Sequence, residues 1–139
     1  MIKIVLDTNI FLSAILYGGM AKTIFKLILE NKLELYVSPD LEDEVLRKLK
    51  EYGATEETIE YAALFLNHKS ISISPPIKVT LCRDPNDNFL LELSQTAEAD
   101  YLITRDKDLL ELPSHKWKKT EIVKPETFLP QLRSMKIIR

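Results

Sequence analysis

Carboxylate side chains follow short apolar runs at several separated points of this sequence. If the runs are neighbouring strands, the carboxylates meet at one edge of a sheet, where like charges repel unless they are protonated or bind a metal. A group of carboxylates without histidine or thiol suits a hard cation, Mg²⁺ or Mn²⁺. Such a site commonly activates water for displacement at phosphorus. The carboxylates in question are Asp7, Glu44, Asp84, Asp87, Asp106 and Asp108.

Each of these residues also has a simpler explanation. Asp7 and Asp106 could cap the helices predicted after them, because Asp is a favoured N-cap residue. Asp84 and Asp87, three residues apart, resemble a capping box, and Glu44 could be a solvated residue in the first half of a helix. It is the coincidence of several separate segments, each ending in a carboxylate, that favours a metal site.

The elements that must position these residues alternate between strands and helices. Apolar runs and one serine–isoleucine alternation predict strands over 2–6, 33–37, 70–74, 101–104 and 121–123. Helical spacing and N-cap signals, two of them Ser-Pro and Asp-Pro, predict helices over 8–17, 21–31, 39–52, 56–69, 85–98 and 107–112, and one from residue 125. This alternation predicts an α/β fold with a parallel sheet covered on both faces, whose ligands bind beyond the carboxyl ends of the strands.

The chain resembles the PIN-domain ribonucleases through an ordered set of motifs along nearly its whole length. The motifs are Asp7-Thr8-Asn9 after the first strand, Ser38-Pro39-Asp40-Leu41 with Glu44, the run Cys82-Arg83-Asp84-Pro85-Asn86-Asp87-Asn88-Phe89-Leu90, Thr104-Arg105-Asp106-Lys107-Asp108-Leu109-Leu110, and Lys124-Pro125 with Phe128-Leu129. Each motif alone is weak, whereas the ordered set is specific. The branch it resembles most is described as toxins of toxin–antitoxin systems.

The resemblance implies a three-layer α/β/α sandwich with a central, mainly parallel sheet of about five strands. It also implies Mg²⁺- or Mn²⁺-dependent cleavage of RNA, with an antitoxin protein as a possible partner. The metal-binding and catalytic quartet falls on Asp7, Glu44, Asp87 and Asp106. Supporting positions fall on Asn9, Ser38 and Thr104, with Asp84 and Asp108 as possible further ligands. Arg105 departs from the glycine common in this branch, and Ser94 from its usual small alanine; Arg105 could contact a phosphate or be solvated.

The composition of the chain excludes several classes of protein and of binding site. The 139 residues suit a single domain, 1–139, and a net charge of −2 excludes a uniformly basic nucleic-acid coat. The chain has three glycines, and they form no glycine-rich phosphate-binding motif. Its single cysteine excludes internal disulfides and zinc ribbons. The short, interrupted apolar runs indicate no signal peptide or membrane span, so we expect a cytoplasmic protein.

Two other functions compete with a nuclease: a PIN-like module that binds RNA or protein with little catalysis, and a metal phosphohydrolase acting on small substrates. The second is disfavoured because Asp7-Thr8-Asn9 lacks the DxD that aspartyl-nucleophile phosphatases often want after the first strand.

Several further residues have both a functional and a structural interpretation. Trp117 among lysines could stack on a base, although packing at the edge of the core is the commoner role. Cys82 is expected to be a buried structural thiol. Apolar helix faces predict a homodimer; the residues are Ile24, Phe25, Ile28, Leu64 and Phe65.

Overall fold

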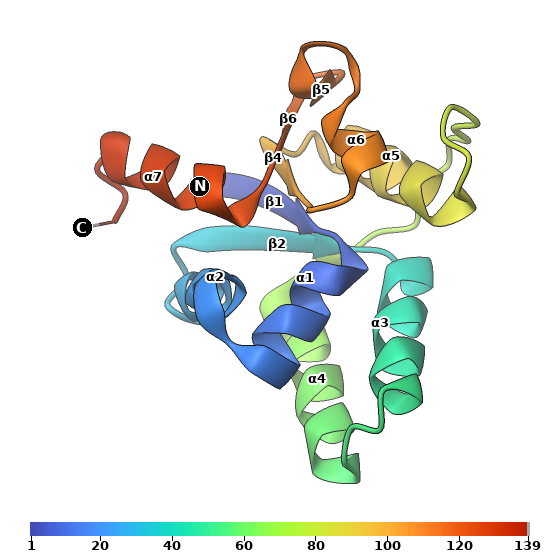
Figure 1. Ribbon diagram of the computed structural model, residues 1–139, viewed down its shortest axis with the longest axis vertical. Helices are drawn as coiled ribbons and strands as arrows, with labels where there is room; N and C mark the ends of the chain where they lie inside the picture. Colours follow the sequence, from blue (N-terminus) through green and yellow to red (C-terminus); the bar gives the residue numbers. More distant parts are fainter. Residues whose placement is uncertain (139) are drawn as a thin grey trace.

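A six-stranded sheet forms the centre of the computed structural model, which describes residues 1–138 (Figure 1). Its order is β3-β2-β1-β4-β6-β5, and neighbouring strands are parallel except for the antiparallel pair β5–β6. The strands are β1 (Ile2–Leu6), β2 (Leu33–Val37), β3 (Ser70–Ser72), β4 (Tyr101–Ile103), β5 (Lys116–Trp117) and β6 (Thr120–Val123).

Helices cover both faces of this sheet, which confirms the predicted α/β/α sandwich. Helices α1 to α4 are grouped on one side in Figure 1, and α5 packs on β1, β2 and β4 from the other side, with α6 near it. Helix α7 contacts α2. The helices are α1 (Thr8–Leu12), α2 (Gly19–Leu29), α3 (Pro39–Glu51), α4 (Glu56–Lys69), α5 (Pro85–Ala97), α6 (Lys107–Leu110) and α7 (Pro125–Ser134), with a π-helical turn η1 (Ser13–Tyr17) and a 3₁₀ turn η2 (Pro113–His115).

The N-cap signals in the sequence start helices where they were predicted. The Ser38 hydroxyl accepts a hydrogen bond from the backbone N–H of Leu41 at 3.2 Å, with Pro39 at the first helical position. The Thr55 hydroxyl accepts one from the N–H of Thr58 at 3.1 Å. These bonds satisfy N–H groups that the first helical turn leaves without an intrahelical partner.

Two local predictions were wrong. The segment 8–17 is not one α-helix: after α1 the chain widens into η1, where the N–H of Gly18 bonds the carbonyl of Ser13 at 2.7 Å, five residues back. The sheet also has a sixth strand, the two-residue β5, in a hairpin with β6. A strand this short has no detectable alternation, and its turn uses Lys118 at φ +55° rather than a glycine.

The strand order switches at β1 and β4, and the carboxyl ends of these two strands are where a ligand site is expected. The chain builds β1, β2 and β3 in one direction and then returns to β4 on the opposite side of β1. The N–H of Asp7 donates to the carbonyl of Ile103 at 3.0 Å, so β1 and β4 leave the sheet side by side. Ligands of open parallel sheets bind at such a point, beyond the carboxyl ends of the strands.

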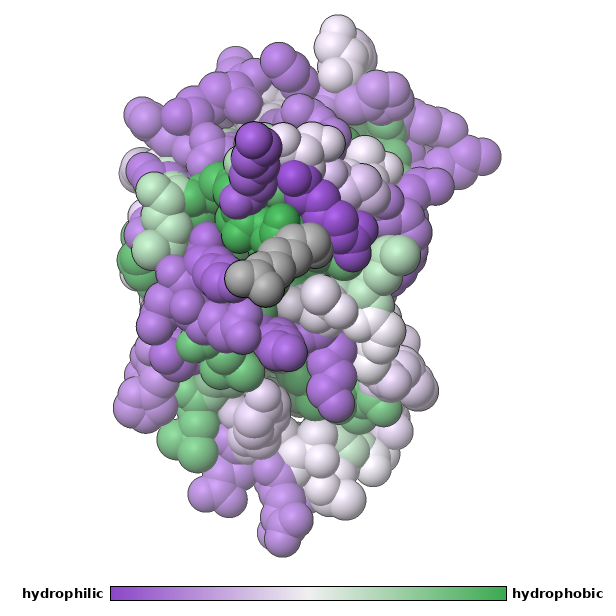
Figure 2. Space-filling model, turned by 90° about the vertical axis from the view of Figure 1, so that its left-hand side faces the viewer, coloured by the Kyte–Doolittle hydropathy of each residue, from purple (hydrophilic) through white to green (hydrophobic). Residues whose placement is uncertain are grey.

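The apolar helix faces that predicted a homodimer are used inside the chain. Ile24, Phe25, Ile28 and Phe65 are each at most 4% exposed and belong to the core, whereas Leu64 is 52% exposed. Figure 2, which faces the left-hand side of Figure 1, shows a mostly hydrophilic surface with separate apolar patches. These four residues therefore give no support to a dimer.

Within residues 1–138, no single helix has the length and apolar composition needed to cross a membrane. A bent pair, Thr8–Tyr17 with Gly19–Leu29, passes the same test of length and composition at an angle of 96°.

Candidate metal centre

Asp7 lies at the carboxyl end of β1 and is tied to β4 through Thr104. The Thr104 hydroxyl donates to Asp7 Oδ2 at 2.6 Å and accepts from the N–H of Asp106 at 2.9 Å. Asp7 is 8% exposed and its side chain makes no cap hydrogen bond, which disfavours the helix-cap explanation. Burial, opposed by the Thr104 hydrogen bond, raises the pKa of the Asp7 carboxyl.

Asp84 and Asp87 occupy the start of α5 but differ in their bonding. Asp84 is the N-cap, and its Oδ1 accepts from the N–H of Asn86 at 2.9 Å. Asp87, one turn in, is 4% exposed, and its Oδ2 has no hydrogen-bond partner among residues 1–138. Burial, and after it the charge of Asp106 and neighbouring carboxylates, raises the pKa of Asp87 to about 7.

Asp106 and Asp108 bring two further carboxylates from the start of α6. Asp106 Oδ1 accepts from the N–H of Asp108 at 2.8 Å, so the cap explanation holds for this oxygen. One oxygen each of Asp87, Asp106 and Asp108 nevertheless lies within 4.8 Å of the others. Capping and metal binding are compatible here, because a carboxylate has two oxygens.

Glu44, Ser38 and Asn9 occupy different positions around this cluster. Glu44 is half-buried on α3 and lies outside the group of three Asp oxygens, although its charge contributes to the raised pKa of Asp7. Ser38 is buried and its hydroxyl caps α3. Asn9 is exposed in the first turn of α1.

The cluster fits a hard divalent cation. Three carboxylate oxygens converge from α5 and α6, and Asp87 Oδ2 is buried without a partner, an arrangement that costs free energy unless a proton or a cation neutralises it. Oxygen donors alone match the preference of Mg²⁺ and Mn²⁺.

Sequence reasoning missed the side chains that support the cluster. Arg83 reaches both oxygens of Asp108, at 3.1 and 3.2 Å, while remaining 89% exposed. The side chain of Asn88 accepts from the N–H of Cys82 at 2.8 Å and donates to its carbonyl at 3.1 Å. Buried Glu92 accepts from the N–H of Val79 at 2.8 Å. These bonds fix the irregular segment that leads into α5; Arg83 and Asn88 both lie within the motif 82–90.

The remaining sequence candidates have structural roles. Cys82 is half-buried rather than buried as predicted, and burial and nearby carboxylates raise the pKa of its thiol, which disfavours the reactive thiolate. Trp117 is half-buried against the core with Lys118 Nζ 5.0 Å from the ring centroid. Arg105 is engaged with Glu126, its Nε donating to Oε1 at 3.2 Å.

Comparison with known proteins agrees with this architecture. The chain matches the PIN domain family over residues 3–108. It is 34% identical over 117 residues to the uncharacterized protein MJ1680 of Methanocaldococcus jannaschii, covering 80% of this chain and 75% of that protein. The crystal structure of VapBC2 from Rickettsia felis bound to a promoter DNA fragment contains a chain of similar fold, with a TM-score of 0.64 at 15% identity, covering 88% of this chain and 98% of that one. Because the family match covers residues 3–108, most of the chain, this chain belongs to the PIN domain family.

Proposed function

We propose that the protein is a Mg²⁺- or Mn²⁺-dependent endoribonuclease. The observation that carries this proposal is the convergence of Asp87, Asp106 and Asp108 around a buried, unpartnered carboxylate oxygen. Helix capping uses only one oxygen of Asp106 and does not explain the buried Oδ2 of Asp87, whereas a metal-dependent hydrolysis uses such carboxylates to hold the cation that activates water. PIN-domain membership supports nuclease chemistry rather than hydrolysis of a small phosphate ester.

Asp7, Glu44, Asp87 and Asp106 would hold the cation, with Asp84 and Asp108 as further ligands. The bound cation would supply an activated water and stabilise the charge of the in-line displacement. The hydroxyl of Thr104 orients Asp7 by donating to its Oδ2, leaving Oδ1 for the site. The water oxygen would bond to phosphorus as the bond to the 3′ oxygen breaks, leaving a 5′-phosphate and a 3′-hydroxyl.

Cleavage of RNA with and without metal tests this function. We expect the wild type to cleave a pool of labelled RNAs with added Mn²⁺ and to lose this activity in excess EDTA. Asp7→Asn keeps the shape and removes the charge, so it should reduce cleavage to background while its circular dichroism spectrum and melting transition remain those of a folded protein. Asp40→Asn, on the exposed first turn of α3, is the matched control and should retain activity.

Full activity in EDTA, or in the Asp7→Asn protein, would contradict the assignment. RNA binding without cleavage at any metal concentration would instead support the PIN-like binding module. Hydrolysis of small phosphate esters without RNA cleavage would support the phosphohydrolase.

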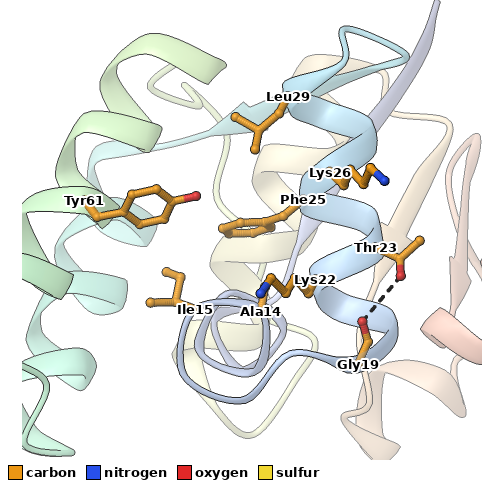
Figure 3. A pocket seen from close by; sticks show the side chains of 9 residues that line it. All are labelled: Ala14, Ile15, Gly19, Lys22, Thr23, Phe25, Lys26, Leu29 and Tyr61. Atoms are coloured by element: carbon orange, nitrogen blue, oxygen red, sulfur yellow. Dashed lines mark hydrogen bonds between the residues drawn. The ribbon is translucent and has the colours of Figure 1, made fainter.

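We infer in addition that this nuclease is the toxin of a toxin–antitoxin pair and that the antitoxin docks between α2 and α4. A groove of about 550 Å³ lies there, and in Figure 3 Tyr61 from α4 points across it towards Phe25 of α2, between Leu29 and Ile15. Tyr61 is 48% exposed and Leu29 42%. This apolar groove with Lys22 and Lys26 on α2 suits an amphipathic segment that carries acidic residues.

Substitution of Leu29 tests antitoxin docking without touching the acidic cluster. Leu29 lines the groove and is 42% exposed on α2, so we expect Leu29→Lys to keep the circular dichroism spectrum of a folded protein. If a small protein is encoded beside this chain, we expect Leu29→Lys to weaken its copurification, whereas Leu64→Lys, at an exposed position of α4 that does not line the groove, should not. Equal copurification of the two variants would contradict docking in the groove.

A homodimer also remains a proposal, supported now only by exposed apolar side chains such as Leu64 and Tyr17. Light scattering of the wild type alone tests it, and a monomer at micromolar concentration would contradict it.

A further inference from the structure

A second groove, of about 730 Å³, runs along β6 between α6 and the start of α7. Its floor is apolar, formed in part by Leu110 and by Ile122 and Val123 of β6, of which the last two are buried. Its rim carries the cations Arg105, Lys107 and Lys124; Glu111 and Glu121 also line the groove, so cations outnumber carboxylates there by one. The acidic cluster does not line it, so it is a separate feature of the surface.

The sheet brings this groove next to the acidic cluster. The N–H of Thr104 donates to the carbonyl of Val123 at 2.9 Å, so Lys124 leaves β6 beside the point where the chain leaves β4. Arg105 and Lys107 directly flank Asp106 in the sequence. The groove and the acidic cluster are therefore adjacent on the surface, so one polymer can contact both.

The cations of the rim differ in how strongly they are engaged by acids. Arg105 is held against Glu126 of α7. Lys107 comes no closer than 3.9 Å to Glu111, and both side chains are largely exposed, a pairing worth little in water. Lys124 is exposed and, among residues 1–138, has no ion-pair partner within 4.0 Å. Lys124 and Lys107 are thus available to an anion from outside.

An apolar floor with a basic rim is the combination that binds a single strand of nucleic acid, whose bases present flat apolar faces and whose backbone is anionic. Carboxylates repel a phosphate chain, so cations beside the acidic cluster offset that repulsion. The His115 ring closes the far part of the groove, with Nδ1 2.7 Å from the carbonyl of Leu110.

We propose that this groove binds the RNA strand on one side of the cleaved phosphodiester, with Lys124 and Lys107 on its phosphates and a base against Leu110 and Thr127. The proposal rests on the proposed nuclease function, since it assigns the neighbouring part of the same substrate. It makes the groove a determinant of substrate affinity, distinct from the carboxylates that carry out the reaction.

Binding of a short labelled single-stranded RNA, measured by fluorescence anisotropy in the Asp7→Asn background, tests the groove without turnover. Lys124→Glu reverses the exposed charge, and we expect it to raise Kd about tenfold and to lower the salt dependence of log Kd by about one ion. Thr127→Trp adds an indole to the exposed lining without changing charge, and we expect a similar loss. The control Lys32→Glu makes the same charge change just before β2, at the opposite end of the sheet from the acidic cluster, and should alter Kd less than about twofold, within the range of a remote charge.

Unchanged Kd in both Lys124→Glu and Thr127→Trp would overturn the groove, as would an equal loss in Lys32→Glu, which would indicate an effect of overall charge alone. The nuclease proposal is judged separately, by cleavage with Mn²⁺ in proteins that carry Asp7. If those proteins cleave RNA and the groove variants bind normally, only the groove falls. If the wild type neither binds nor cleaves RNA, both proposals fall.

Discussion

Burial has opposite consequences in two regions of this molecule. Between α2 and α4, the rings of Phe25 and Phe65 stack at 4.2 Å, and Phe11 meets Phe25 edge-on at 5.8 Å. Removing these rings from water stabilises the fold. At the carboxyl edge of the sheet, Asp7 and Asp87 are almost as well buried, and their ionised forms lose hydration instead.

This comparison indicates that burying the carboxylates lowers the stability of the folded state, and that burying the aromatic rings offsets this loss. Natural proteins keep such locally unfavourable sites where function requires them. One region buries aromatic rings and the other buries carboxylates. Substitutions that remove these groups should therefore change the free energy of unfolding in opposite directions.

The largest effect on stability is expected from the apolar region. Phe65→Ala removes a ring that is 4% exposed and should lower the free energy of unfolding by about 3–5 kcal/mol. Urea unfolding measures this, with Tyr61→Ala on the same helix as a control at a 48% exposed position, where we expect a smaller loss. If the Phe65→Ala protein unfolds at the wild-type urea concentration, the core between α2 and α4 is not packed as described.

The acidic region should respond in the opposite direction. The pKa of Asp87 is raised from 3.8 to about 7, so the folded protein holds a proton over a pH range in which the unfolded chain has lost it. The free energy of unfolding of the metal-free protein should therefore fall as pH rises from about 4 to about 7, by up to about 1.4 kcal/mol for each pH unit.

Asp87→Asn should reduce this pH dependence and be more stable than the wild type at pH 8 in EDTA. Asp7, whose pKa is also raised, contributes with the same sign and remains in the variant. Urea titrations of both proteins at pH 5 and pH 8 measure the difference. Parallel pH profiles for the two proteins would show that Asp87 is ionised without cost.

The smallest expected effect is a change in melting temperature that distinguishes metal binding from helix capping at Asp106. Metal that binds only the folded state stabilises it by about 2.7 kcal/mol at a hundredfold excess over Kd. Asp106→Asn keeps a side chain that caps α6 and loses a ligand charge, so it should melt at or above the wild-type temperature in EDTA and gain less from Mn²⁺. Thermal melts of wild type, Asp106→Asn and the control Asp40→Asn measure this. Equal Mn²⁺ shifts in all three would remove Asp106 from the metal site.

Most of the fold could be predicted from the sequence because its signals are local. Ser38-Pro39 and Asp84-Pro85 start helices by bonds within one turn, and the apolar run at residues 2–6 is a buried strand in any parallel sheet. The strand predicted at 70–74 is present but shorter, at Ser70–Ser72. Where no local signal exists, as in the two residues of β5, prediction failed.

The order of the candidate site residues along the chain could be predicted from the sequence, but their arrangement in space could not. The sequence by itself determined which carboxylates follow which elements, since an Asp after a strand or at a helix start is visible in the letters. Only the tertiary structure decided that Asp87, Asp106 and Asp108 share one small volume, that Asp7 bonds Thr104 across the sheet, and that Arg83 reaches Asp108. Those contacts join residues up to 97 positions apart, and their distances depend on strand order and helix packing, which no local pattern of residues encodes.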